Sequence, residues 1–137
     1  MKILIVDDSK QDRESVIIHI KKMNKNGKVE TDESNCLTNA LKKIKEFTYD
    51  VIILDLSLPE TDGIDTIKKT TAYLKKIKKD IPIIILTGVE DYTIGREAWS
   101  FGIKDFLMKD EIQTQDLSRA LKFVSYNKDI IKKSIFA

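Results

Sequence analysis

The strongest constraint on the fold is a set of short apolar runs that alternate with longer, charged segments. The runs are continuously apolar rather than alternating with polar residues, a pattern typical of strands buried on both faces of a parallel sheet. A weaker strand is expected at residues 28–31, after the first charged segment. The four clear runs are residues 3–6, 51–54, 81–86 and 106–108.

The segments between the runs carry apolar residues at helical spacing. In the first segment, Val16, Ile17, Ile20 and Met23 form one stripe, and Ser9 is the expected N-cap. Similar stripes predict helices near residues 37–44, 64–77 and 94–101 and from about residue 112 onward. Strand therefore precedes helix five times, which predicts a three-layer α/β/α fold with a parallel sheet and right-handed crossovers.

Length and composition favour one domain. A chain of 137 residues has the usual size of a domain, and its 42% of hydrophobic residues is too high for a disordered chain. No Pro-, Gly- or Ser-rich linker interrupts it, and the last helical segment nearly reaches the end. We therefore expect a single domain over residues 1–137, without an output domain.

Charge and cysteine content exclude several classes of protein. A net charge of +2 gives no support to nucleic-acid binding, and no apolar run approaches the roughly 20 residues that span a bilayer. The single cysteine, Cys36, rules out an internal disulfide framework and a multi-cysteine zinc site. A cytoplasmic location is expected, with binding to neither nucleic acid nor membrane.

Polar residues lie where the predicted strands end. Asp7 and Asp8 follow the first run, Asp55 follows the third strand, Thr87 follows the fourth and Lys109 ends the fifth. Ligands of open α/β sheets bind beyond the carboxyl ends of the strands. We therefore expect three carboxylates, a hydroxyl and an ammonium to converge at one edge of the sheet.

This set of side chains suits phosphoryl transfer. A single Asp after a strand most often caps the next helix, but three together repel one another unless a cation neutralises them. Oxygen ligands call for Mg²⁺ or Ca²⁺, and the small number of carboxylates favours Mg²⁺. One of the carboxylates can act as a nucleophile that forms an aspartyl phosphate, with Lys109 and Thr87 stabilising the transferred group.

These residues resemble the receiver domain of two-component response regulators over essentially the whole chain. The resemblance implies a flavodoxin-like, doubly wound, five-stranded sheet with strand order 2-1-3-4-5. It rests on five pieces in the family's order. They are Asp7-Asp8, residues 54–59 (Leu-Asp-Leu-Ser-Leu-Pro), Asp62-Gly63, residues 86–88 (Leu-Thr-Gly) and residues 105–109 (Asp-Phe-Leu-Met-Lys).

The resemblance also implies a role for each site residue. Asp55 would accept a phosphoryl group from a phosphohistidine on a histidine kinase or phosphotransfer protein. Asp8 and Asp55 would bind Mg²⁺ directly, Asp7 through water, and Ser57 through its backbone carbonyl. Lys109 would pair with the phosphoryl oxygens. Receivers of this kind are signalling switches, so an enzyme with turnover of its own is not expected.

Switching and output follow from the same resemblance. Thr87 would move its hydroxyl onto the phosphoryl group, and Phe106 would fill the space that it leaves. The family usually has Pro after the lysine, often with a cis peptide, whereas Asp110 stands here. Because a non-proline cis bond costs about 2.5–4 kcal/mol, we expect either a trans bond with a shifted loop or a strained cis bond.

Two apolar residues are predicted to face solvent and to dock partners. Ile18 lies nearly opposite the apolar stripe of the first helix, and Trp99 points away from Ala98 and its neighbours on the fourth. Ile18 is the candidate contact for the phosphodonor. Trp99 and Phe106 are the candidate contacts for a downstream protein that the sequence does not name, and a phosphorylation-dependent dimer is left open.

Three other functions fit the sequence less well. A degenerate receiver would bind proteins without phosphorylation, but the chain retains every charged site residue. A haloacid-dehalogenase-like phosphatase needs a second acid two residues after the nucleophile, where this chain has Ser57. A flavodoxin-like carrier needs a hydroxyl- and amide-rich phosphate loop, where this chain has the repelling pair Asp7 and Asp8.

Overall fold

Five strands and five helices alternate along the chain, as the sequence pattern predicts. The computed structural model describes residues 1–24, 27–88 and 92–136, and for residues 92, 93 and 126–136 it describes the backbone alone. The strands are β1 (Lys2–Val6), β2 (Glu30–Ser34), β3 (Val51–Leu54), β4 (Ile83–Thr87) and β5 (Asp105–Met108). The helices are α1 (Lys10–Met23), α2 (Leu37–Glu46), α3 (Ile64–Lys76), α4 (Tyr92–Trp99) and α5 (Thr114–Phe136).

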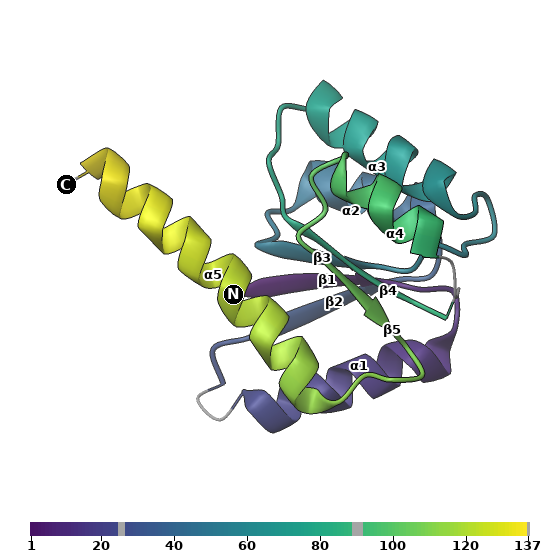
Figure 1. The fold of residues 1–137 in the computed structure, drawn as a ribbon, viewed down its shortest axis with the longest axis horizontal. Helices are drawn as coiled ribbons and strands as arrows, with labels where there is room; N and C mark the ends of the chain where they lie inside the picture. The colour runs from purple at the N-terminus through teal and green to yellow at the C-terminus, as the bar shows by residue number, and fades with distance from the viewer. Residues whose placement is uncertain (25–26, 89–91, 137) are drawn as a thin grey trace.

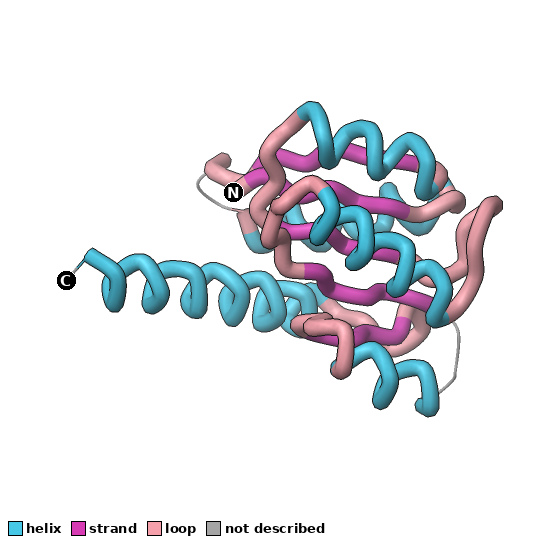
Figure 2. Tube along the Cα trace, turned by 90° about the horizontal axis from the view of Figure 1, so that it is seen from above, coloured by secondary structure: helices cyan, strands magenta, loops and turns pink. Residues whose placement is uncertain are grey.

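The strands form one parallel sheet in the order β2-β1-β3-β4-β5. Figure 1 shows α2, α3 and α4 on one face of the sheet and α1 and α5 on the other. The view in Figure 2 shows the strands side by side and α5 extending beyond the rest of the molecule. The predicted three-layer fold and strand order are confirmed.

The core consists of two apolar layers, one on each face of the sheet. Along β1, Leu4 and Val6 pack with residues of α2, α3 and α4, whereas Ile3 and Ile5 pack with residues of α1 and α5. Because successive side chains of a strand point to opposite faces, a strand covered on both sides must be apolar at every position. This requirement explains the continuous apolar runs of β1, β3 and β4.

β2 and β4 differ from the sequence-based prediction at both ends, and β1 and β5 each begin one residue earlier than predicted. β2 begins at Glu30 rather than at residue 28, because it is an edge strand in which Ser34 is buried and its other residues are not. β4 begins at Ile83 and includes Thr87. Pro82 lacks the N–H group that a central strand requires, although its carbonyl accepts a hydrogen bond from the Ile52 N–H.

No helix in the described part of the chain is both long enough and apolar enough to cross a bilayer.

Candidate functional site

Asp7 and Asp55 lie close together because the backbone hydrogen bonds of the sheet continue one residue beyond the ends of β1 and β3. The Asp7 N–H donates to the Ser34 carbonyl at 3.0 Å, and the Asp55 N–H donates to the Val6 carbonyl at 2.9 Å. These bonds hold both residues at the carboxyl end of the sheet. Asp7, Asp8 and Asp55 each offer a carboxylate oxygen, and the three oxygens lie within 4.8 Å of one another. This arrangement suits a hard divalent cation such as Mg²⁺.

Lys109 brings a positive charge to the same place. Its backbone N–H donates to the Thr87 carbonyl at 2.9 Å, which places the end of β5 beside the end of β4. The ammonium nitrogen, Nζ, lies 2.7 Å from Asp7 Oδ2, 2.8 Å from Asp12 Oδ2 and 3.0 Å from Asp55 Oδ2. Burial alone would lower the pKa of Lys109, but hydrogen bonds to the three carboxylates outweigh it and raise the pKa.

The electrostatics at Asp7 favour the binding of a cation. Burial raises the pKa of Asp7 above its usual range, and the negative charge of Asp55 adds to that rise. Hydrogen bonds from Lys109 Nζ and the Ser9 N–H act in the opposite direction but do not overcome burial. One ammonium therefore does not fully compensate the carboxylates around it, and a divalent cation would relieve the remaining repulsion.

A cavity of about 430 Å³ opens over Asp55. Thr87 is fully buried at the end of β4, and Ser57 donates its backbone N–H to Asp55 Oδ1 at 3.3 Å. The Asp55 carboxylate therefore lines this cavity together with a hydroxyl side chain and an ammonium, an arrangement that suits a phosphoryl group. Its lining consists of Asp12, Asp55, Ser57, Thr87, Gly88, Lys109 and Asp110.

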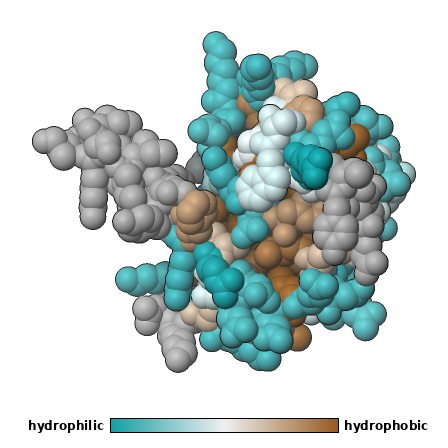
Figure 3. Space-filling view, viewed as in Figure 1, coloured by the Kyte–Doolittle hydropathy of each residue, from teal (hydrophilic) through white to brown (hydrophobic). Residues whose placement is uncertain are grey.

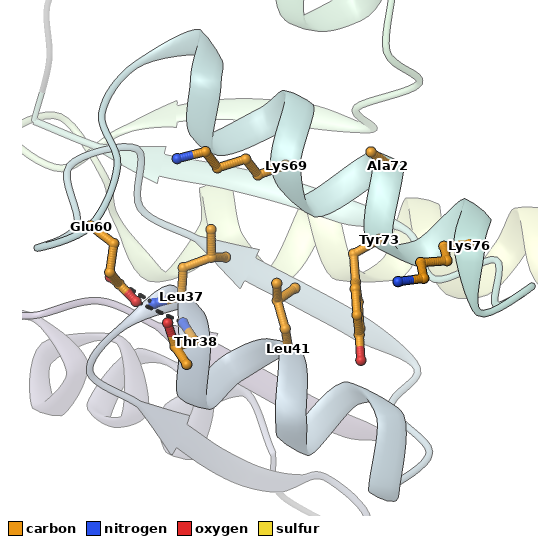
Figure 4. A pocket seen from close by; sticks show the side chains of 8 residues that line it. All are labelled: Leu37, Thr38, Leu41, Glu60, Lys69, Ala72, Tyr73 and Lys76. Carbon is orange, nitrogen blue, oxygen red and sulfur yellow. Dashed lines mark hydrogen bonds between the residues drawn. The ribbon is translucent and has the colours of Figure 1, made fainter.

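The loop that follows Asp55 is fixed to its surroundings. The hydroxyl of Thr66, a residue of α3, donates to the Leu56 carbonyl at 2.7 Å. Farther along the loop, the Glu60 carboxylate accepts the Leu37 and Thr38 N–H groups at 3.1 and 2.7 Å and so caps α2. Figure 4 shows Glu60 at one end of the groove between α2 and α3. Hydrogen bonds thus hold the β3–α3 connection at Leu56 and at Glu60, and this limits the positions of Asp55 and Ser57.

The three predicted docking residues occupy two regions. Ile18 on α1 and Trp99 on α4 are 53% and 55% exposed, as predicted, and lie on opposite sides of the sheet. Phe106 on β5 is half-buried and packs against the core layer under α4. Figure 3 shows apolar side chains gathered over β5, between α4 and α5. α4, which carries Trp99, and β5, which carries Phe106, border this area, whereas α1, which carries Ile18, covers the other face of the sheet.

Two residues of the site were not identified from sequence. Asp12 contributes a carboxylate to Lys109, and Arg13 donates to the Asp7 carbonyl at 2.7 Å and pairs with Glu33 at 3.1 Å. Their position in the first turn of α1, directly after the acidic pair, was the available signal. The Lys109–Asp110 bond is trans, since no cis peptide occurs in the described residues.

Comparison with known proteins agrees with this geometry. A family model described as the response regulator receiver domain matches residues 3–122. The chemotaxis protein CheY of Thermotoga maritima is 34% identical over 86 residues, which cover 63% of this chain and 68% of CheY. The transcriptional regulatory protein ResD of Bacillus subtilis is 32% identical over 108 residues, covering 79% of this chain but 41% of ResD.

A solved structure shows the same fold. The response regulator receiver domain protein from Clostridium thermocellum has a TM-score of 0.78 and 26% identity, with 95% of this chain and 98% of that chain covered. The present chain spans less than half the length of ResD, so similarity to ResD concerns one part of that protein.

Proposed function

The chain belongs to the response regulator receiver domain family, and on that premise we propose that it accepts a phosphoryl group on Asp55 and signals through altered protein contacts. Receiver domains are signalling switches of two-component systems and typically bind Mg²⁺ at an acidic pocket. The observation that carries the proposal is the Asp55 carboxylate, which lines an open cavity while Lys109 Nζ lies 3.0 Å from its Oδ2.

The donor in this proposal is a phosphohistidine on a histidine kinase or phosphotransfer protein. A carboxylate oxygen of Asp55 attacks the phosphorus, a P–O bond forms and the P–N bond to the donor imidazole breaks, with its electron pair returning to the imidazole. The product is a mixed anhydride on Asp55. Lys109 pairs with the phosphoryl oxygens, and the Thr87 hydroxyl donates to them.

The acidic residues supply the metal site. Asp8 and Asp55 would hold Mg²⁺ directly, Asp7 through water and Ser57 through its backbone carbonyl. Bound Mg²⁺ neutralises negative charge on the transferring group and on the carboxylates. The close approach of the Asp7, Asp8 and Asp55 oxygens supports this assignment, as does the raised pKa of Asp7.

Output would follow from a movement of Thr87 and Phe106. Thr87 turns toward the phosphoryl group, Phe106 occupies the vacated space, and the face formed by α4, β5 and α5 changes. A downstream protein would dock on this face at Trp99 and Phe106. Ile18, on the far side of the sheet, would contact the phosphodonor instead. The exposure of Trp99 and Ile18 supports both assignments.

Intact-mass measurement after incubation with acetyl phosphate and Mg²⁺ tests the proposal. The wild-type chain should gain the mass of one phosphoryl group, and Asp55→Asn should gain none. Asp65→Asn is the matched control, because Asp65 is an exposed acid in the first turn of α3. A wild-type chain that gains no mass would favour the alternative of a phosphorylation-independent binding module.

A further inference from the structure

All three N–H groups of the Lys109 ammonium are engaged in the unphosphorylated protein. A lysine has three donors and no acceptor, and Nζ lies within 3.0 Å of one carboxylate oxygen each from Asp7, Asp12 and Asp55. Phosphorylation removes the charge of the Asp55 carboxylate, so one phosphoryl oxygen can take over the donor that Asp55 holds. A second phosphoryl oxygen would need a donor that Asp7 or Asp12 holds, and one of these two carboxylates must then release Lys109.

Asp12 can pair with Lys109 because Asp7 accepts the Ser9 N–H, which an acid at the position of Asp12 accepts in a capping box. Ser9 caps α1, and its hydroxyl accepts the Asp12 N–H at 3.2 Å. In a capping box the acid at this position would accept the Ser9 N–H in return. Here Asp7 Oδ1 accepts that N–H at 2.9 Å, so the Asp12 carboxylate is directed to Lys109 instead.

Exposure decides which of these two carboxylates gives way. The side chain of Asp7 is 5% exposed, whereas that of Asp12 is 44% exposed. Once released, a buried carboxylate would lose a charged partner without gaining water, at a high cost in free energy. Asp12 can turn into solvent and recover most of its hydration, so its release costs least.

We propose that Asp12 is a positioning residue that holds Lys109 in the unphosphorylated state and competes with the incoming phosphoryl group for the same ammonium. This inference rests on the proposed function of Asp55. Phosphorylation would then break the only side-chain ion pair that joins α1 to Lys109 among the described residues. The Asp12 carboxylate opposes phosphorylation because it neutralises charge that the phosphoryl oxygens need.

The rate of phosphorylation tests the competition. With saturating Mg²⁺ and acetyl phosphate at low ionic strength, Asp12→Asn should be phosphorylated about threefold faster than the wild type, the effect expected of a partly exposed ion pair. Asp12→Glu keeps the charge and should restore the wild-type rate. Glu14→Gln removes an exposed acid from the same helix, 4.0 Å from Lys10, and should change nothing.

The Lys109 ammonium itself gives a second measurement that does not depend on the rate. In the metal-free protein, Asp12→Asn should shift the ¹H–¹⁵N NMR signal of Lys109 Nζ, whereas Glu14→Gln should not. After phosphorylation the wild-type and Asp12→Asn signals should coincide, because Lys109 no longer contacts residue 12 in either protein.

The failures of the two proposals can be told apart. If the wild type takes no phosphoryl group, the proposed function is wrong and this inference falls with it. If the wild type is phosphorylated but Asp12→Asn reacts at the same rate or more slowly, the competition is wrong while the function stands. A Lys109 signal that still differs between the two phosphorylated proteins would also overturn it.

Discussion

Asp7 and Asp55 are nearly buried carboxylates at the end of a parallel sheet, and the negative charge of Asp55 disfavours ionisation of Asp7. Lys109 compensates for part of this cost, yet the pKa of Asp7 stays raised. Phosphoryl transfer requires a negative nucleophile and a cation beside it, so the features that destabilise the metal-free site are those that the chemistry uses.

A substitution of Asp8 tests metal binding without a change in the stability of the metal-free fold. Its side chain is exposed, so Asp8→Asn should leave the free energy of unfolding of the metal-free protein nearly unchanged. Mg²⁺ at a hundredfold excess over its dissociation constant should stabilise the wild type by about 2.7 kcal/mol, and this gain should be largely lost in the variant. Urea unfolding with and without Mg²⁺ measures both quantities. Glu14→Gln should keep the full gain, and an equal gain in Asp8→Asn would contradict the metal assignment.

Glu60 should make folding stability depend on pH. Burial disfavours its charge, but the Thr38 and Leu37 N–H groups outweigh burial and lower its pKa from 4.5 to about 2. A depressed pKa stabilises the fold above the unfolded value and loses that effect as the pH falls from 4.5 toward 2. Glu60→Gln should therefore cost about 1 kcal/mol at neutral pH, as loss of a helix cap does, and little at pH 2.

Unfolding of Glu60→Gln and wild type across this pH range measures the difference. The matched control is Glu46→Gln, an exposed acid in the last turn of α2. A cost that is the same at both ends of the range would show that the Glu60 carboxylate does not cap α2 through its charge.

Sequence reasoning found the residues whose position follows from a strand end. Asp7, Asp55 and Lys109 each follow or end an apolar run, and parallel strands bring such residues to one edge. Asp12 and Glu60 were missed because their partners, Lys109 and the first turn of α2, are distant in sequence. The local sequence indicates a capping box at Asp12 and an ordinary loop acid at Glu60. The packing of the helices and strands instead brings Asp12 to Lys109 and Glu60 to the first turn of α2.

At the scale of elements, the end of α3 shows how one turn connects two helices on the same face of the sheet. The Lys79 N–H donates to the Leu74 carbonyl and the Lys78 N–H to the Lys75 carbonyl, the bonding pattern of a Schellman motif. This turn directs the Lys79 ammonium to the end of α2, where it donates to the Ile44 carbonyl at 2.6 Å and the Phe47 carbonyl at 3.1 Å.

Lys78 is strained in this turn. Its φ is +58°, in the left-handed region that glycine adopts at little cost and other residues adopt at about 1–2 kcal/mol. Lys78→Gly should therefore raise the free energy of unfolding by about 0.5–1 kcal/mol. Chemical unfolding measures the change. Lys75→Gly, inside the helix, should instead lower the stability by about 1 kcal/mol, and a loss in both variants would show that Lys78 is not strained.

A strand could be predicted from the sequence where burial on both faces requires it to be apolar. β3 has the predicted bounds because it lies between two strands and two layers of helices. β2 was placed two residues too early, since an edge strand that reads Glu-Thr-Asp-Glu-Ser has no apolar run to mark it. Strand order could not come from periodicity at all and was supplied by the family resemblance.

At the scale of the whole molecule, the sheet separates the two candidate docking regions. Ile18 lies on the α1 side and Trp99 on the α4 side, so a phosphodonor and a downstream protein would meet different surfaces. The proposed phosphoryl site lies at the edge of the sheet between them. Signal transmission from this edge to the α4–β5–α5 face therefore requires the proposed movement of Thr87 and Phe106.

Trp99 can report that movement because it is the only tryptophan in the chain. Phosphorylation should change its fluorescence, since α4 belongs to the face that the proposed movement of Thr87 and Phe106 would alter. At equal phosphorylation, judged by intact mass, Thr87→Ala should show less than half of the wild-type change, because the hydroxyl that moves is gone. A full change in Thr87→Ala would assign the fluorescence response to another route.

Transfer from a donor protein followed by chemical mapping tests the central claim most directly. The chain would be incubated with Mg²⁺ and a phosphotransfer protein phosphorylated on histidine, then treated with borohydride, which reduces an aspartyl phosphate to homoserine. Peptide sequencing by mass spectrometry should find homoserine at position 55 and aspartate at positions 7, 8 and 12. Homoserine at any of those other positions, or an unmodified chain beside a fully phosphorylated donor, would contradict the account.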